Sequence, residues 1–250
     1  YGNGVHQWYC GMQDAGGVLQ KGPWVGNRFH WYCLFDNEDY RITKGVKHRF
    51  QYDSQVKNGR GYYYPGTPEY KLMATGKNMD DVKVQEPVAP FNDGLTYTNS
   101  ISSNCLAFTT KYADVTDPTI GRTDAYWPFL RYADIVLIYA EAQCELNDGI
   151  SQDAIDALND IRIRSNAKEA SVTGDGAIET KVELRSVIFE ERAKELAYEG
   201  GRRWDLLRWG IYLDVMNSLG GINEDGTRTP YDEGSINKRR EFRHLLYPVP

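Results

Sequence analysis

Three glutamates at four-residue spacing, Glu191, Glu195 and Glu199, are the side chains whose pattern most suggests chemistry. This spacing places them on one face of a helix, and two carboxyl groups facing a cleft are the machinery of glycoside hydrolysis. One aspartate and two arginines follow closely: Arg202, Asp205 and Arg208. Carboxylates beside arginines more often form ion pairs that hold helices together, because charged groups are seldom buried without a partner. We therefore predict that the three glutamates and these three residues together form structural ion pairs, and that the chain is not an enzyme.

Other catalytic and metal-binding patterns are missing from the sequence. The four histidines are isolated from one another and from any cysteine or carboxylate at metal-ligand spacing: His6, His30, His48 and His244. No glycine-rich phosphate loop opens a helix, and no GxSxG motif is present. We expect neither a metal nor a cofactor.

The elements that must position the glutamates read as helices. Thr180 and Glu183 have the spacing of a capping box, which predicts a helix start, and Gly200 and Gly201 predict its end. A shorter amphipathic turn around Trp204 is expected to follow. Upstream, apolar residues at helical spacing predict a helix over 130–147, with Cys144 as a small core residue.

A second upstream helix, over 151–166, is expected to begin with Ser151 as its N-terminal cap. The connection between these two helices is short, so they should pack antiparallel as a helical hairpin. Short glycine-punctuated segments fill the first 70 residues, and a strand is predicted at 106–110.

Four sequence strings resemble, in order, the motifs of the SusD/RagB family of outer-membrane lipoproteins. They are LRYADIVLIYAEA at 130–142, ALNDIRIR at 157–164, ERAKELAYEGGRRWDLLRWG at 191–210 and LLYPVP at 245–250. Asp39 and Arg41 also match an Asp-x-Arg pair that is common in the family. Four motifs in the same order are far more specific than any one of them.

This resemblance implies a mostly α fold, in which tetratricopeptide-like helical hairpins pack with a large, irregular, loop-rich aromatic region. It also implies that a cell-surface protein binds a glycan and delivers it to a SusC-like, TonB-dependent outer-membrane transporter. The protein would be held in the outer membrane by an N-terminal lipid anchor that is absent from this chain.

Composition sets the outer limits. The chain has 35 acidic and 29 basic residues among 250, which gives a net charge of −6. This composition provides no excess of positive charge to attract nucleic acid. We predict a loop-rich aromatic region at 1–128 and a helical region at 129–250, both parts of one larger domain that is truncated at both ends.

Aromatic residues in the first 70 positions are the candidate ligand surface: Trp8, Trp24, Trp31, Tyr62 and Tyr64. Exposed rings stack on the apolar face of a sugar, while a tyrosine hydroxyl can also form hydrogen bonds. The alternative is that these rings fasten loops to the core. The acidic helical half is expected to carry no comparable aromatic surface.

The sequence therefore leaves three hypotheses of different classes. The first is a glycan-binding protein of the SusD type. The second is a helical protein-interaction scaffold, or a peptide-binding relative without carbohydrate affinity. The third, least favoured because ion pairing accounts for the carboxylates, is a glycoside hydrolase. The glycan itself is not indicated.

Overall fold

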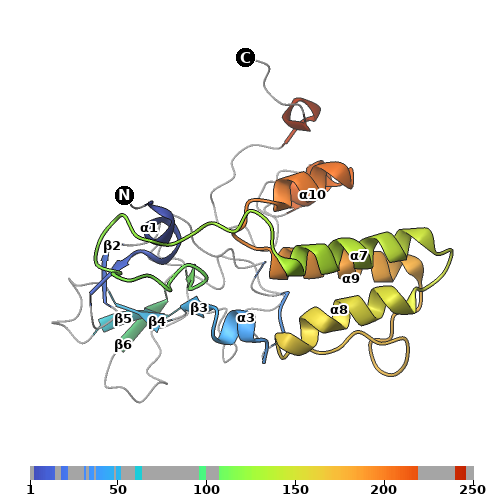
Figure 1. Ribbon diagram of the computed structural model, residues 1–250, viewed down its shortest axis with the longest axis horizontal. Coiled ribbons are helices and arrows are strands. Elements are labelled where there is room, and N and C mark those ends of the chain that lie inside the picture. The colour runs from blue at the N-terminus through green and yellow to red at the C-terminus, as the bar shows by residue number, and fades with distance from the viewer. Residues whose placement is uncertain are drawn as a thin grey trace.

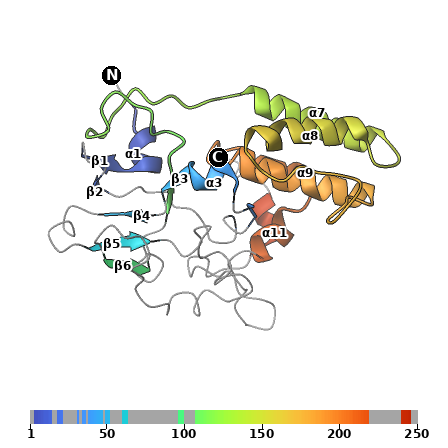
Figure 2. The ribbon, with the colours of Figure 1, turned by 90° about the horizontal axis from the view of Figure 1, so that it is seen from below.

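The computed structural model describes residues 3–14, 18–21, 31, 34–36, 38–47, 49–51, 60–63, 96–99, 107–218 and 240–245. The long helices α7, α8 and α9 pack together at one end of the molecule, and the short strands and α1 lie at the other (Figures 1 and 2). The short helix α3 (Tyr40–Thr43) lies between the two parts. A site at this junction therefore draws on residues from distant parts of the sequence.

The predicted helical hairpin is confirmed. Helix α7 covers Tyr132–Leu146 and helix α8 covers Gln152–Arg164, and Figure 1 shows them running side by side in opposite directions. The Ser151 hydroxyl accepts a hydrogen bond from the Ala154 amide at 3.3 Å, which caps α8 as expected.

Helix α9 (Lys181–Glu195) begins with the predicted capping box but ends earlier than predicted. Leu196 already leaves the helix, and Tyr198 has a left-handed φ of 68°, two residues before Gly200 at 81°. The expected end at the two glycines was wrong, because cations from other elements bind the backbone carbonyls at this point. Two short helices follow, α10 (Arg202–Arg208) and α11 (Tyr212–Ser218).

The rest of the described chain is built from short elements. They are α1 (Val5–Cys10), β1 (Met12–Gln13), β2 (Leu19–Lys21), β3 (Val46–Lys47), β4 (Arg49–Phe50), β5 (Arg60–Tyr63), β6 (Thr96–Asn99), β7 (Phe108–Thr109) and the 3₁₀ helix η1 (Phe242–Leu245). Strands β1 and β2 pair antiparallel, as do β3 and β7. Strand β5 pairs antiparallel with β4 and parallel with β6. The strand predicted at 106–110 is confirmed as β7.

The main hydrophobic core lies between α7, α8 and α9. Five fully buried residues at its centre come from all three helices: Leu137, Cys144, Leu158, Leu184 and Ile188. Burying a side chain the size of leucine stabilises the fold by about 1.5 to 3 kcal/mol. The mostly helical fold is thus confirmed, and Cys144 is the small core residue that was expected.

The tetratricopeptide-like repeat and the division at residue 128 remain predictions. Among the described residues, no helix combines the length and the apolar character that crossing a membrane requires.

Candidate functional site

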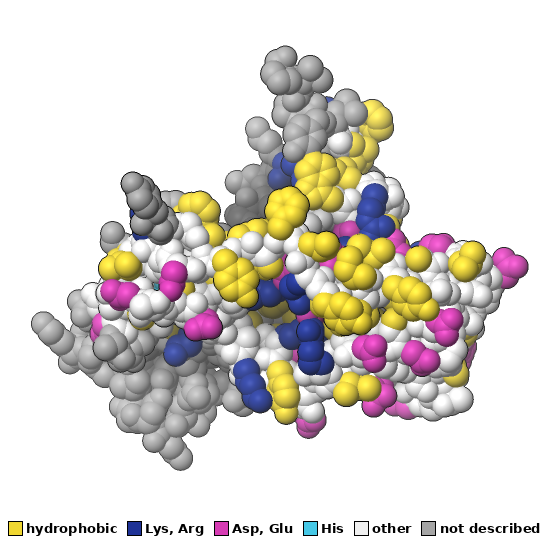
Figure 3. Space-filling model, in the orientation of Figure 1, with side chains coloured by type: hydrophobic (Ala, Val, Ile, Leu, Met, Phe, Trp, Pro, Cys, Tyr) yellow, Lys and Arg dark blue, Asp and Glu magenta, His cyan; other side chains and the backbone are white. Residues whose placement is uncertain are grey.

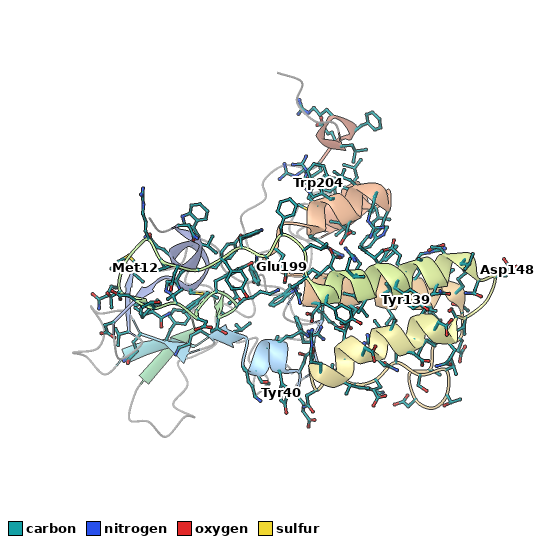
Figure 4. All side chains as sticks on the ribbon, viewed as in Figure 1. Met12, Tyr40, Tyr139, Asp148, Glu199 and Trp204 are labelled. Atoms are coloured by element: carbon teal, nitrogen blue, oxygen red, sulfur yellow. The ribbon has the colours of Figure 1, made fainter. Side chains whose placement is uncertain are left out.

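The three glutamates lie in a cluster of charged side chains at the junction between the helical bundle and the strands, where Figure 4 labels Glu199. Glu191 is fully buried, and each of its carboxylate oxygens accepts a hydrogen bond from a different arginine. Its Oε1 is 2.5 Å from Nη1 of Arg41 on α3, and its Oε2 is 2.8 Å from Nε of Arg162 on α8. Glu191 therefore joins α3, α8 and α9.

Glu195 lies one helical turn further along α9 and accepts from three guanidinium groups. Its Oε1 is 2.7 Å from Nη1 of Arg131 and 2.6 Å from Nη2 of Arg164. Its Oε2 is 3.2 Å from Nη1 of Arg41. Burial raises the pKa of Glu195, but the charges and hydrogen bonds of Arg131 and Arg164 outweigh burial and hold that pKa below 4.5. Glu195 is therefore ionised, whereas a general acid needs a raised pKa.

Arg41, which the sequence analysis noted together with Asp39, is a central cation of the cluster. Asp39 caps α3 by accepting from the backbone amide of Arg41 at 2.8 Å, and its Oδ2 lies 2.7 Å from Nη2 of the same arginine. Burial lowers the pKa of Arg41, yet the hydrogen bonds and charges of Asp39 and Glu191 outweigh burial and leave the pKa above its ordinary value. Arg41 stays charged and links α3 to α9.

The early end of α9 gives the cluster its remaining contacts. Nζ of Lys111 donates to the carbonyls of Glu195 and Ala197, both at 3.0 Å, and to the carboxylate of Glu199. Nη2 of Arg131 lies 2.6 Å from the Glu195 carbonyl, and its Nε lies 2.8 Å from Oε2 of Glu199. Burial lowers the pKa of Lys111. These cations satisfy carbonyls at the helix end that have no partner within the helix.

Asp205 and Arg208 form a separate cluster. Oδ2 of buried Asp205 lies 2.9 Å from Nε of Arg192, and Oδ1 lies 3.0 Å from Nη2 of Arg208. Arg208 also pairs with Glu141 at 2.5 Å, whereas Arg202 donates to a backbone carbonyl of α9 at 3.0 Å. The expected pairing of these residues with the three glutamates was therefore wrong in its partners. The glutamates instead form ion pairs with cations from α3, α8 and the segments before α7.

A cavity of about 340 Å³ lies beside the glutamate cluster, between α3, β7 and the C-terminal ends of α8 and α9. Three aromatic side chains line it: Trp31, Tyr40 and Tyr198. The indole N–H of Trp31 donates to the Ala193 carbonyl at 2.9 Å, and its ring meets the Tyr198 ring edge-on at 5.6 Å. The indole is therefore held rigidly while part of it stays accessible, as contact with a sugar face requires.

The same cavity is lined by four cations and one carboxylate: Arg41, Lys111, Arg164, Lys194 and Glu195. Arg164 is the most accessible of these cations, with 55% of its side chain exposed, and it forms an ion pair with Glu195. Lys194 is 8% exposed and pairs with Glu190 at 2.6 Å. Figure 3 shows Lys and Arg side chains gathered at the centre of the visible face, between the two parts of the molecule.

Among the aromatic side chains expected to bind a ligand that the structure describes, Trp31 is the residue that reaches this cavity. Trp31 lines it, whereas Trp8 lies on α1, is 44% exposed and is not among the lining residues. Tyr62 lies in β5, and Trp24 and Tyr64 lie outside the described residues. A ligand-binding role for all five remains a prediction.

The expectation that the helical half has no aromatic surface was wrong. Large exposed side chains follow α7 and the segment before it: Tyr126, Phe129, Leu130, Tyr132, Ile135, Ile138 and Tyr139. We call these seven residues the α7 face, and in Figure 3 a yellow surface extends over this helix. Phe129 is 100% exposed and Tyr132 is 81% exposed.

A groove of about 410 Å³ lies between α7 and α8, next to the α7 face. Tyr132, Ile135 and Tyr139 of α7 line it, together with three exposed aspartates of α8: Asp153, Asp156 and Asp160. The helical spacing of the tyrosines and isoleucines was readable in the sequence. Spacing alone does not separate these exposed residues from the buried Val136, Leu137 and Ala140 of the same helix.

Nucleophilic and metal-binding chemistry finds little support in the described part of the chain. Within residues that the structure describes, no group of three or more His, Cys, Asp or Glu side chains is placed to hold a metal ion. Nδ1 of buried His6 lies 2.9 Å from the Tyr112 carbonyl. Burial raises the pKa of the Cys10 thiol to about 12, so at neutral pH this thiol is not a nucleophile.

Comparison with known proteins gives a consistent result. The family model described as the SusD family matches residues 26–250. SusD-like protein P38 of Formosa agariphila is 36% identical over 135 residues, and SusD-like protein P25 of the same organism is 39% identical over 89 residues. These matches cover 52% and 36% of this chain, but 24% and 16% of the relatives. The chain thus spans about a quarter or less of these relatives' length.

Two solved structures are similar as well. A SusD homolog from Bacteroides thetaiotaomicron aligns with a TM-score of 0.52 and 22% identity over 85% of this chain and 38% of its own. A SusD superfamily protein from Parabacteroides distasonis aligns with a TM-score of 0.54 and 18% identity over 98% of this chain and 43% of its own. At these identities the similarity shows a shared fold alone.

Proposed function

This chain belongs to the SusD family, and from that membership we propose that it binds an oligosaccharide at the cell surface and delivers it to a SusC-like, TonB-dependent outer-membrane transporter. The match over residues 26–250 carries this proposal. The protein works on the outer face of the outer membrane, where a lipid anchor holds it. Its task is capture and transfer of the ligand.

The cavity at the junction supports capture of a sugar. Trp31 offers an apolar ring that its hydrogen bond to the Ala193 carbonyl holds in place. Tyr40 and Tyr198 add further rings, and charged groups that line the same cavity can bind hydroxyls. Each ring stacked on a sugar contributes about 0.5 to 1.5 kcal/mol, by analogy with other aromatic contacts. Fixed rings with a few polar groups are the usual makeup of a small-molecule binding site.

The paired carboxylates argue against hydrolysis at this site. A glycoside hydrolase needs one carboxyl group that is protonated near neutral pH and a second that acts as base or nucleophile. Both oxygens of Glu191 accept hydrogen bonds from Arg41 and Arg162, and Arg131 and Arg164 hold the pKa of Glu195 below its ordinary value. Glu195 is therefore ionised and cannot act as the acid, and the oxygens of Glu191 are held by arginines.

Calorimetric titration with a panel of soluble polysaccharides and peptides tests the proposal. We expect Trp31→Ala to weaken binding of the cognate glycan by about 1 to 3 kcal/mol, in the range of single hot-spot truncations. Trp204→Ala is the matched control, because Trp204 is 50% exposed on α10 and does not line the cavity. Equal affinity of both variants and the parent would place the sugar site elsewhere.

A protein-binding scaffold is the second candidate function, and the α7 face favours it. Exposed apolar side chains gathered along one helix commonly mark an interaction site. Exposed aspartates line the neighbouring groove. The fitting partner is therefore a protein segment whose apolar side chains are flanked by lysine or arginine. A peptide of that composition should bind the parent and not Tyr132→Ser, while Trp31→Ala should leave its binding unchanged.

A further inference from the structure

We propose that the sugar bound in the junction cavity is acidic, carrying a carboxylate or sulfate group that Arg164 binds. This inference rests on the proposed function, because it names the class of glycan that the same site takes. Two observations support it. The charged residues beside the cavity have an excess of positive charge, and Arg164 has N–H groups without a partner in the described part of the chain.

The ion-paired cluster beside the cavity has an excess of positive charge. Among the residues that the structure describes, its salt bridges join four carboxylates, Asp39, Glu191, Glu195 and Glu199, to five cations, Arg41, Lys111, Arg131, Arg162 and Arg164. One positive charge is left over, and the separate pair of Lys194 and Glu190 is neutral. The chain as a whole has a net charge of −6, so this wall is positive against an acidic background. A partly enclosed excess charge favours a ligand of opposite sign.

Arg164 is the cation whose donors remain available. The N–H groups of Arg41 and Lys111 donate to several carboxylate and carbonyl oxygens of the cluster. Arg164 uses only Nη2, which donates to Glu195 at 2.6 Å, and its remaining N–H groups have no partner within the described part of the chain. It is the last residue of α8, lines the cavity and is 55% exposed. A guanidinium with free N–H groups binds a planar carboxylate or a sulfate through two parallel hydrogen bonds.

The aromatic side of the cavity fits the same ligand. Trp31 and Tyr198 provide ring surface in the cavity that Arg164 also lines, so a sugar ring and its acidic substituent can be bound together. The volume of about 340 Å³ lies near the lower end of typical ligand sites, which suits one or two sugar units. A neutral sugar would leave the free donors of Arg164 without a charged partner.

Calorimetry with three polysaccharides tests the inference: polygalacturonate for the carboxylate, carrageenan for the sulfate and unsubstituted galactan as the neutral probe. We expect one acidic polymer to bind more tightly than galactan, and Arg164→Gln to weaken that binding by about tenfold to a hundredfold. Arg164→Lys, which keeps the charge but not the paired N–H groups, should fall between the two. Arg185→Gln is the matched control, because Arg185 lies on α9, pairs with exposed Glu145 and does not line the cavity.

The outcomes separate the two proposals. Tight binding of galactan that Arg164→Gln leaves unchanged overturns the acidic-sugar inference and leaves glycan capture standing. Equal losses in Arg164→Gln and Arg185→Gln also overturn it, because the attraction would then be general. Binding of none of the three polymers or of any other glycan, with binding of polyglutamate instead, overturns glycan capture itself. Circular dichroism of each variant confirms that the exposed substitutions leave the fold intact.

Discussion

The junction cluster and the α7 face belong to the same helical bundle, yet they are built in opposite ways. At the junction, the carboxylates of Glu191 and Glu195 are almost completely buried, and arginines from three other elements bind them. Along the α7 face, Phe129 and Tyr132 are exposed although burial would favour them. Charged groups are thus enclosed where neighbouring elements supply partners, and apolar groups are left in solvent where none does.

This contrast separates structural from interacting surfaces. A buried carboxylate with matched arginines fixes how the helical bundle meets the strands, because breaking one pair leaves another charge buried alone. An exposed apolar face contributes little to folding, since its area is not removed from water within the described chain. Residue type alone therefore does not decide between the two roles: a glutamate can react or hold helices together, and a tyrosine can pack in a core or face a ligand.

The largest effect should come from Glu191→Gln. The substitution removes the charge that Arg41 and Arg162 share in a fully buried position, so we expect the free energy of unfolding to fall by about 3 to 5 kcal/mol. Glu145→Gln is the matched control: Glu145 also pairs with an arginine, but it is 45% exposed, and its loss should cost less than about 1 kcal/mol. Urea denaturation measures both. Similar losses for the two variants would show that the junction is no more structural than a surface ion pair.

A smaller effect is expected from acid. The arginines hold the pKa of Glu195 in the folded protein below 4.5, so its ionised form stabilises the fold fully above that value. As the pH falls below 4.5, the unfolded chain binds a proton first, and the stabilisation is lost progressively until the pH passes the lower folded pKa. Thermal unfolding between pH 6 and pH 3 should show this decline, and Glu195→Gln should reduce its slope. If stability falls with pH as steeply in Glu195→Gln as in the parent, Glu195 does not contribute to the loss of stability in acid.

Local signals in the sequence predicted much of the bundle. The capping box of Thr180 and Glu183, the Ser151 cap and the short link between α7 and α8 each depend on neighbouring residues, so sequence spacing was sufficient. The motifs at 130–142 and 191–210 identified the family for the same reason. Such signals say little about contacts between distant segments.

The missed features all depend on distant partners. Arg41 lies 150 residues from Glu191 in the sequence, so the partner of this glutamate could not be found by spacing. Helix α9 ends early because Lys111 and Arg131 bind its terminal carbonyls, and neither contact is encoded in the helix itself. Exposure of Tyr132 was equally invisible, since a helix that is apolar on several sides has the sequence pattern of a buried one.

The smallest effect on stability should come from Phe129→Ser. This result would separate the exposed α7 face from the buried charges of the junction most clearly. Phe129 is fully exposed before α7, so we expect its substitution to change the free energy of unfolding by less than about 0.5 kcal/mol. Leu137→Ala on α7 is the reference, because this buried core leucine should cost about 2 to 5 kcal/mol. The same Phe129→Ser variant should bind less of a fluorescent dye that reports exposed apolar surface, and it should associate less with itself at high concentration in sedimentation experiments. A loss of more than about 1 kcal/mol for Phe129→Ser would mean that the ring is packed in solution, and the α7 face would then be part of the core.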